Sequence, residues 1–226
     1  MIVQTQAVVL KRFPYGDTSV IAHVFARETG KVSVIAKGAR RKGSNLAACF
    51  QPLSYLDIIY YHKDTRDLQT ISKAEFVQTW SKFSTDLTAV TMALALVEIT
   101  DKTMEHYDPH PELFDHLVAV LGEFDRGEMA KNILYWHYQL RVLSEMGFRP
   151  DIVNKDLPDY GILANAKNSR HILTALLANE LQTIPLLRVS GNDKKTINDY
   201  IYEQFRRHIE GLRELKSLQV LRQLVL

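Results

Sequence analysis

The sequence predicts an α+β protein in which a five-stranded antiparallel barrel is followed by an all-α domain. The first 80 residues contain short β-branched runs separated by turn residues, with no helical pattern long enough for a crossover connection. From residue 84 the spacing of apolar residues changes to that of amphipathic helices. The 226 residues are enough to bury a substantial core, in one large domain or two small ones.

Five runs in the amino-terminal part have the length and composition of β-strands. The polar segments YGDT, ETGK and KDTRD separate some of them as turns. In the third run Val32, Val34 and Ala36 alternate with other residues, as expected of a strand with one face in a core. The predicted strands lie within 5–13, 19–26, 31–38, 53–63 and 68–80. Short strands at this spacing are typical of a small barrel.

The rest of the chain has helical periodicity with recognisable ends. One segment begins at Asp108 and stops at Gly127, and the next stops at Gly147 ahead of Pro150. Residues 151–170 have little periodicity and are expected to form an irregular connection. Helices are predicted within 84–101, 108–127, 132–150, 172–181, 195–210 and 212–226. The predicted domains are therefore 1–80 and 81–226.

The composition of the chain indicates its cellular compartment and the charge of its binding partner. No apolar run approaches the roughly 18 residues that cross a bilayer, and the amino terminus lacks the pattern of a signal peptide. The only cysteine, Cys49, excludes an internal disulfide and favours a reducing cytoplasm. Residues 1–80 carry 11 Lys/Arg against 6 Asp/Glu, a net +5, whereas residues 81–150 carry 6 against 11, a net −5. This asymmetry favours an anionic partner for the amino-terminal part.

Several patterns that suggest catalysis or metal binding have simpler explanations. His106, His110 and His116 lie close together in sequence, but Pro109 and Pro111 interrupt any helix that would align them. A solvated corner between helices is therefore the favoured interpretation. Glu98, Asp101 and Glu105 lie at helical spacing, which is more often an exposed acidic face. No catalytic residue, cofactor or metal is expected.

A strongly basic segment, VIAKGARRKGSN, follows the third predicted strand. Its cations are Lys37, Arg40, Arg41 and Lys42. An isolated charge run is usually a solvated turn. Here it follows a strand of a predicted barrel of the oligonucleotide-binding (OB) type, in which the face of strands 2–3 and the connecting loops hold nucleic acid. The segment is therefore predicted to contact phosphates.

Other residues of the predicted barrel extend this candidate site. Lys11, Arg12 and Lys31 complete the predicted DNA-binding set, and Arg27, Lys63 and Arg66 add charge nearby. Aromatic rings stack on the bases of single strands without sequence preference. The candidate rings are Tyr15, Phe50, Tyr55, Tyr60 and Tyr61, although each is individually more often a core or sheet residue.

Residues 7–56 closely resemble the amino-terminal half of the bacterial DNA repair and recombination mediator family RecO. The resemblance rests on Tyr15-Gly16-Asp17, Thr29-Gly30-Lys31, the block AKGARRK at 36–42, and Phe50-Gln51-Pro52. The segments YQLRVLSEMGFRP and LKSLQVL are similar to parts of the family's second half. Many members carry a four-cysteine zinc module after the helix that ends in G-x-P. This chain has no Cys or His from Phe148 to Arg170, so no zinc module is expected.

The resemblance implies an OB-fold with a helical domain, a bacterial cytoplasmic location at the nucleoid, and a function without enzymatic chemistry. It implies binding of single- and double-stranded DNA, annealing of complementary strands, and loading of RecA on DNA coated by the single-stranded DNA-binding protein, with RecR as a partner. A non-enzymatic RNA-binding OB protein is the alternative, because a phosphate clamp does not distinguish the two sugars. A hydrolase that uses the histidine corner is a third class.

The resemblance also implies a docking site for the acidic, apolar-ended tail of the single-stranded DNA-binding protein. Such a tail needs an apolar groove with cations at its rim. The helix NILYWHYQLRVLSEMGFRP offers His137, Tyr138 and Arg141 as candidate partner-binding residues. The alternative is that Tyr138 packs in the core and Arg141 pairs with an acidic neighbour such as Glu145. The second candidate rim is Arg206, Arg207 and Arg213.

Overall fold

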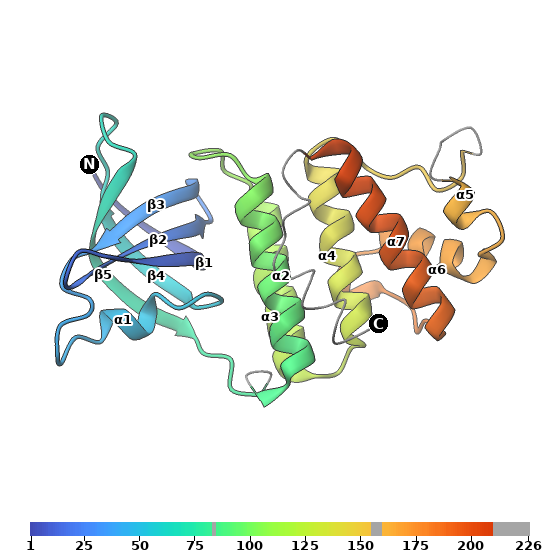
Figure 1. The fold of residues 1–226 in the computed structure, drawn as a ribbon, viewed down its shortest axis with the longest axis horizontal. Helices are drawn as coiled ribbons and strands as arrows, with labels where there is room; N and C mark the ends of the chain where they lie inside the picture. Colours follow the sequence, from blue (N-terminus) through green and yellow to red (C-terminus); the bar gives the residue numbers. More distant parts are fainter. Residues whose placement is uncertain (83–84, 155–159, 210–226) are drawn as a thin grey trace.

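A computed structural model of the chain describes residues 1–82, 85–154 and 160–209. It places a β-barrel at one end of the molecule and a group of helices beside it (Figure 1). The helices α2 and α3 lie next to the barrel, and α4, α7, α5 and α6 lie beyond them. The α+β fold class predicted from the sequence is confirmed.

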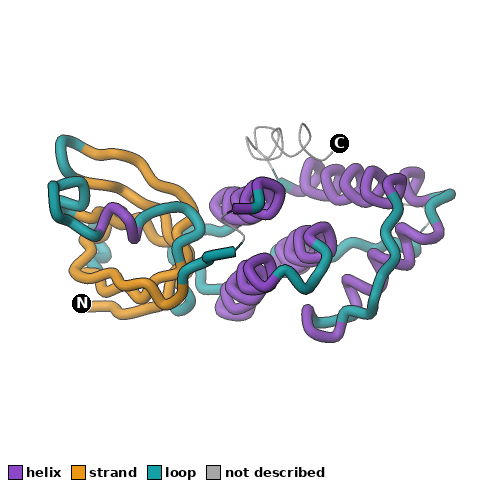
Figure 2. The backbone as a smooth tube through the Cα atoms, turned by 90° about the horizontal axis from the view of Figure 1, so that it is seen from below, coloured by secondary structure: helices purple, strands orange, loops and turns teal. Residues whose placement is uncertain are grey.

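Five strands close the described barrel in the order β1-β2-β3-β5-β4. Figure 2 shows the strands, in orange, gathered at one end of the molecule beside the helices. The predicted strand count is confirmed, and so is the antiparallel pairing at four of the five seams. The fifth seam, between β3 and β5, is parallel and short. The strands are β1 (Ile2–Tyr15), β2 (Ser19–Ala26), β3 (Gly30–Ala36), β4 (Tyr55–Tyr61) and β5 (Leu68–Gln78), with the helix α1 (Leu46–Cys49) between β3 and β4.

The interior of the barrel is filled mainly by small and β-branched side chains. Strand residues on one side of the pleat, among them Ala7, Val9 and Ala22, are fully or almost fully buried. Phe50 and Tyr60 are the largest side chains of this core. Small inward-facing residues suit the narrow interior of a closed barrel of few strands, which side chains alone can fill.

The helical part contains five helices longer than two turns in the described residues. They are α2 (Leu87–Thr103), α3 (Pro111–Arg126), α4 (Lys131–Glu145), α6 (Lys167–Ala178) and α7 (Gly191–His208), with the short α5 (Tyr160–Leu163) before α6. A Ser190–Asp193 capping box starts α7 four residues earlier than periodicity predicts. The segment 151–170, expected to be irregular, contains α5 and the start of α6. The predicted helix 212–226 lies outside the described residues.

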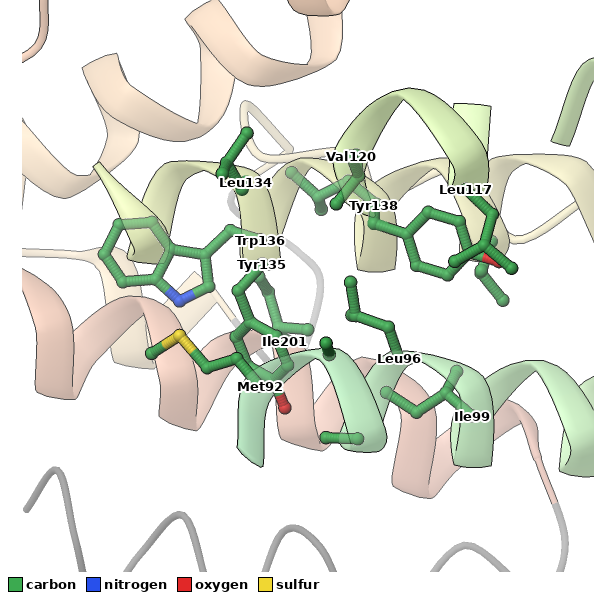
Figure 3. Packing of buried hydrophobic residues seen from close by; sticks show 14 of the residues in the cluster. Met92, Leu96, Ile99, Leu117, Val120, Leu134, Tyr135, Trp136, Tyr138 and Ile201 are labelled. Atoms are coloured by element: carbon green, nitrogen blue, oxygen red, sulfur yellow. The ribbon is translucent and has the colours of Figure 1, made fainter. Parts of the chain in front are cut away.

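The centre of the helical part is α4, which is buried along most of its length. Figure 3 shows Leu134, Trp136 and Tyr138 of α4 among side chains of α2, α3 and α7. The same apolar cluster includes Val8 and Phe25 of the barrel's outer surface. The boundary at residue 80 stays a prediction, because β5 ends at Gln78 and α2 begins at Leu87 while one apolar cluster joins both parts. No helix in the described ranges is long and apolar enough to cross a membrane.

Polar contacts add to this junction between barrel and helices. Asp101 of α2 is only 8% exposed and accepts a hydrogen bond from His23 Nδ1 at 2.8 Å. Lys31 of β3 is also buried, and its Nζ donates to the Asp101 carbonyl oxygen at 2.7 Å. Arg27 pairs with Asp115 of α3 through two hydrogen bonds of 2.7 and 2.8 Å. The expectation that Asp101 lies on an exposed acidic face is therefore wrong, because α2 turns this residue toward the barrel.

The segment 104–110, which follows α2, lies against the start of β3. Tyr107 donates its backbone N–H to the Lys31 carbonyl oxygen at 3.0 Å. Gly30 has a left-handed φ of +70°, and a Cβ built on it would come within 2.1 Å of the Asp108 carbonyl oxygen. This close approach requires glycine at position 30.

We expect Gly30→Ala to lower the free energy of unfolding by about 3 kcal/mol, since the added methyl group collides with backbone and the left-handed φ is strained. Gly16→Ala is the matched control, because Gly16 also has a positive φ, of +53°, but open space around the site of its Cβ. The control should cost only about 1 kcal/mol. Urea unfolding of both variants measures the difference, and equal losses would contradict the proposed close contact.

Two tyrosines of α4 differ in how their hydroxyl groups are satisfied. Thr100 donates to the Leu96 carbonyl oxygen, so the Tyr138 hydroxyl donates to Thr100 Oγ1 at 2.7 Å. The Tyr135 hydroxyl is buried and has no hydrogen-bond partner among the described residues.

We expect Tyr138→Phe to destabilise the protein by about 1 kcal/mol, and Tyr135→Phe to be neutral or stabilising. Thermal unfolding of the two variants tests this, and the reverse order would show that the Tyr135 hydroxyl is paired.

Candidate nucleic-acid interface

The basic segment forms a compact, folded loop between β3 and α1. Gly38 and Gly43 have φ values of +70° and +86°, which reverse the chain twice. The Arg41 N–H donates to the Gly38 carbonyl oxygen, and the Ser44 N–H donates to the Arg41 carbonyl oxygen, both at 3.0 Å. Ala39 is fully buried and packs in the core of the barrel. These contacts hold the loop against the barrel while its cationic side chains face outward.

Arg40 braces this loop against the turn between β1 and β2. Its backbone N–H donates to the Thr18 carbonyl oxygen at 2.8 Å. Its Nη2 donates to the carbonyl oxygens of Asp17 at 2.6 Å and Gly16 at 3.2 Å. The guanidinium is therefore partly committed to structure, although the residue stays exposed.

Lys37, Arg41 and Lys42 are the cations of the loop that remain available. All three are exposed, and none has an ion-pair partner within the described ranges. Like charges on a short loop repel one another unless an anion lies between them. The loop therefore presents a positive surface suited to an anionic ligand.

A β-bulge on β1 extends this surface with aromatic rings. The register shifts between Val9 and Lys11, so that Leu10 is the extra residue. Because side chains alternate along a strand, the shift turns Lys11, Phe13 and Tyr15 to the outer side of the sheet. Phe13 is 36% exposed and Tyr15 is 55% exposed. We refer to Lys11, Phe13 and Tyr15, together with Lys37, Arg40, Arg41 and Lys42, as the basic face.

The basic face combines charge with stacking surface. Lys11 Nζ lies 4.8 Å from the centroid of the Phe13 ring. Phe13 is not among the rings predicted from the sequence. The only sequence signal that it lies on the same face of the strand as Lys11 and Tyr15 is its spacing of two residues from each. Arg12 is exposed as well, but it pairs in register with the inward-facing Ala22 and therefore lies on the other side of β1.

The structure corrects several residues of the predicted site. Phe50, Tyr55 and Tyr60 are buried, so they do not offer surfaces for bases. Tyr61 is exposed, but it pairs in register with Ile2 at the far end of β1. Lys63 and Arg66 also lie at that end, because the Met1 amino group donates to the carbonyl oxygen of the adjacent His62.

Lys31 is the one predicted DNA-binding cation that the structure places in the interior. Burial lowers the pKa of its ammonium group, although the charges of Asp101 and Glu105 oppose this effect. The ammonium is satisfied by the Asp101 carbonyl oxygen. The prediction that Lys31 contacts phosphate is therefore wrong, because α2 covers this part of the sheet.

The predicted partner-binding residues on α4 do not form a surface. His137 and Tyr138 are fully buried, which contradicts their proposed role in docking. Arg141 forms an ion pair with Glu180 rather than with Glu145, which instead contacts His110. The small pocket beside Arg141, of about 100 Å³, is also lined by Glu112, Glu145 and Glu180. This acidic surrounding does not suit an acidic peptide.

The second candidate rim lies at the end of α7. Arg206 and Arg207 are exposed there, and Arg206 pairs with Glu203 at 2.7 Å. Arg213 lies outside the described residues. Cations in the last turn of a helix also complement its dipole, so these two arginines have a structural role in any case.

The histidines considered for a metal site do not converge. His110 contacts Asp108 and Glu145, whereas His116 contacts His137 at 3.1 Å. Burial, together with His137 and Arg141, lowers the pKa of His116 to about 3, so it is neutral. Within the described ranges no group of three or more His, Cys, Asp or Glu side chains is arranged to hold a metal ion.

A closed barrel in the order β1-β2-β3-β5-β4, with a helix between β3 and β4, defines the class of OB-fold proteins. The model of the family "Recombination protein O N terminal" matches residues 1–80, and that of "Recombination protein O C terminal" matches residues 84–155. The chain belongs to the RecO family.

Curated relatives support the same assignment. The chain is 38% identical over 151 residues to the DNA repair protein RecO of Salinibacter ruber, which covers 67% of this chain and 58% of that protein. It is 34% identical over 152 residues to the protein of the same name from Chlorobium luteolum, and 30% identical over 152 residues to that from Bacillus pumilus. For these two the matched part again covers 67% of this chain and 58% of the relative. The matched part thus spans less than two thirds of the relatives' length.

Proposed function

We propose that this chain acts in DNA repair as a non-enzymatic mediator that binds single- and double-stranded DNA and anneals complementary strands. In this proposal it works in the bacterial cytoplasm, at the nucleoid. The observation that carries the proposal is the basic face, in which Arg40 joins the cationic loop to the turn that directly follows the exposed Tyr15 of β1. Membership of the RecO family, whose relatives carry the name DNA repair protein, supports it.

The physical basis of the binding is neutralisation of phosphates together with stacking. Each cation that meets a phosphate releases condensed counterions, which favours binding and makes it sensitive to salt. Phe13 and Tyr15 add faces on which bases of any sequence can stack. Neither phosphate contacts nor stacking distinguishes one base from another, so the expected binding is general rather than sequence-specific.

Annealing follows from the same surface without covalent chemistry. Two DNA strands repel one another through their phosphates, and a cationic surface that contacts both lowers this repulsion. Base pairing then provides the favourable free energy of the duplex. The role proposed for the protein is to hold two backbones close to each other while leaving the edges of the bases accessible.

The loop cations should set the salt dependence of DNA binding. We expect the Arg41→Ala/Lys42→Ala double variant to bind single-stranded DNA more weakly at every sequence. The slope of log affinity against log salt should decrease by up to about 0.7 for each phosphate that the variant no longer neutralises. Arg40 is left in place because it braces the loop. Fluorescence anisotropy across a salt series measures both quantities.

The Lys63→Ala/Arg66→Ala double variant is the matched control. It removes one lysine and one arginine from exposed positions at the opposite end of the barrel. Its affinity and salt slope should stay close to wild type. Equal effects in the two double variants would show that binding depends on net charge and not on the basic face. Tighter binding of a matched RNA oligonucleotide by wild type would favour the alternative of an RNA-binding protein.

The proposed partners are RecR, the single-stranded DNA-binding protein and RecA. In this proposal the chain displaces or remodels the single-stranded DNA-binding protein so that RecA can be loaded. A strand-annealing assay on DNA coated with the cognate single-stranded DNA-binding protein tests DNA binding and partner engagement together. Annealing of bare strands without annealing of coated strands would support the first role and exclude the second.

For the acidic tail of the single-stranded DNA-binding protein, we propose docking near Arg206 and Arg207. Each candidate site contains a paired arginine, Arg141 with Glu180 and Arg206 with Glu203, but Arg141 has the further carboxylates of Glu112 and Glu145 beside it. We expect the Arg206→Ala/Arg207→Ala variant to bind a fluorescent tail peptide about tenfold more weakly, a loss of about 1.4 kcal/mol. Arg141→Ala, the comparison variant, should bind it as wild type does. If only Arg141→Ala weakened peptide binding, the docking site would instead lie on α4.

A further inference from the structure

His23 occupies the border between the covered and the open part of the barrel's outer surface. On β2 it pairs in register with Lys11 of β1 on one side and with Ser33 of β3 on the other. Its side chain is 25% exposed, whereas its partner Asp101 is 8% exposed. The imidazole therefore contacts Asp101 of α2 through Nδ1, while its ring also contacts Phe13 of the basic face.

The orientation of the ring follows from its neighbours. Asp101 accepts hydrogen bonds and cannot donate them when ionised, so His23 Nδ1 carries a proton in the 2.8 Å contact with Asp101 Oδ1. Edge contacts with Phe13 at 5.7 Å and His106 at 5.9 Å, measured between ring centroids, hold the ring plane. No protein group in the described ranges hydrogen-bonds His23 Nε2, which is left for a ligand or water.

We propose that His23 Nε2 is a proton-linked phosphate contact of the basic face, and that Asp101 is the positioning residue that orients the imidazole and compensates its charge. The inference rests on the DNA binding proposed above and deepens it. When protonated at both nitrogens, the ring donates from Nδ1 to Asp101 and from Nε2 to a phosphate oxygen. Lys11, directly opposite on β1, contributes to the same phosphate site.

The charges around His23 explain why the anion is needed. Lys11 of β1, Lys31 of β3 and His106 in the segment 104–110 face it, and Asp101 is the carboxylate on α2 that contacts it. Burial, with Lys31 and His23, lowers the pKa of His106, so His106 stays neutral near pH 7. A phosphate bound at Nε2 adds a second negative charge beside the ring, in addition to that of Asp101, and therefore favours the imidazolium. DNA binding at this position is therefore coupled to proton uptake.

This coupling predicts the direction of the pH dependence. Histidine is the side chain whose charge ordinarily changes between about pH 5 and pH 8. Because the bound state takes up the proton, affinity should increase as the pH falls. Uptake of at most one proton on binding limits the gain to about tenfold for each unit that the pH falls, and we expect a gain of about fivefold between about pH 8 and pH 6.

The experiment measures the affinity of the full chain for a fluorescent oligo-dT strand at about pH 8, 7 and 6 at constant ionic strength. The central variant is His23→Asn. Its amide nitrogen takes the place of Nδ1 and keeps a donor for Asp101, whereas Nε2 and the titration are lost. We expect wild type to gain about fivefold over this range and His23→Asn to lose most of that gain.

Two further variants separate positioning from stability and from other histidines. Asp101→Asn keeps an acceptor for Nδ1 but removes the negative charge, so the gain at low pH should be reduced while binding at about pH 8 changes little. The melting temperature is recorded for each variant, and if Asp101→Asn unfolds the decision rests on His23→Asn. His62→Asn is the control, because His62 pairs with Asp64 at the opposite end of the barrel. It should retain the full gain.

The outcomes distinguish the inference from the function on which it rests. DNA binding with the same pH dependence in wild type and His23→Asn would overturn the role of His23 and leave the proposed function intact. DNA binding by wild type without any pH dependence would do the same. No measurable binding of DNA by folded wild-type protein would overturn both.

Discussion

The compensation of the buried Asp101 carboxylate is the constraint on which the arrangement of the two parts depends. An ionised carboxylate removed from water is costly unless hydrogen bonds and opposite charges surround it. Burial alone would raise the pKa of Asp101, but the hydrogen bond from His23 and the charges of His23, Lys31 and Lys11 outweigh it and keep the pKa below its ordinary value. All three compensating residues belong to the barrel. The helix α2 can satisfy this carboxylate only when it lies on the outer side of β1, β2 and β3.

This placement divides one sheet surface into two parts with different roles. Val8 and Phe25 belong to the apolar cluster shared with the helices, whereas Phe13 and Tyr15, farther along the hairpin, remain exposed. The bulge at Leu10 determines which residues of β1 reach the exposed part. A continuous pleat would turn Arg12 and Pro14 outward instead of Lys11, Phe13 and Tyr15. One inserted residue thus brings two rings to the outer surface, which would carry a cation, Lys11 or Arg12, in either register.

The uneven charge along the chain is partly compensated within the molecule. Arg27 and Lys31 of the basic amino-terminal part contact Asp115 and Asp101 of the acidic middle part. The charges left over are concentrated in the loop between β3 and α1, where Lys37, Arg41 and Lys42 have no carboxylate partner in the described residues. The opposite signs of the two segments therefore reflect their mutual contact as well as the partner proposed for the loop.

The sequence by itself determined the five strands, the helical second part and the basic loop, because these depend on local alternation, helical periodicity and charge density. It also carried the family resemblance through the AKGARRK block. Only the tertiary structure decided which cations and rings are available. Lys31, Tyr60 and Tyr138 are predicted from the sequence as candidate surface residues, yet all three are buried. Lys31 is buried because α2 covers its part of the sheet, and Tyr60 because the barrel closes around it. Tyr138 is buried because α4 lies at the centre of the helices. Phe13 faces the outer side of the sheet because of the bulge. A register shift depends on how two strands pair, so it cannot be predicted from the composition of either strand.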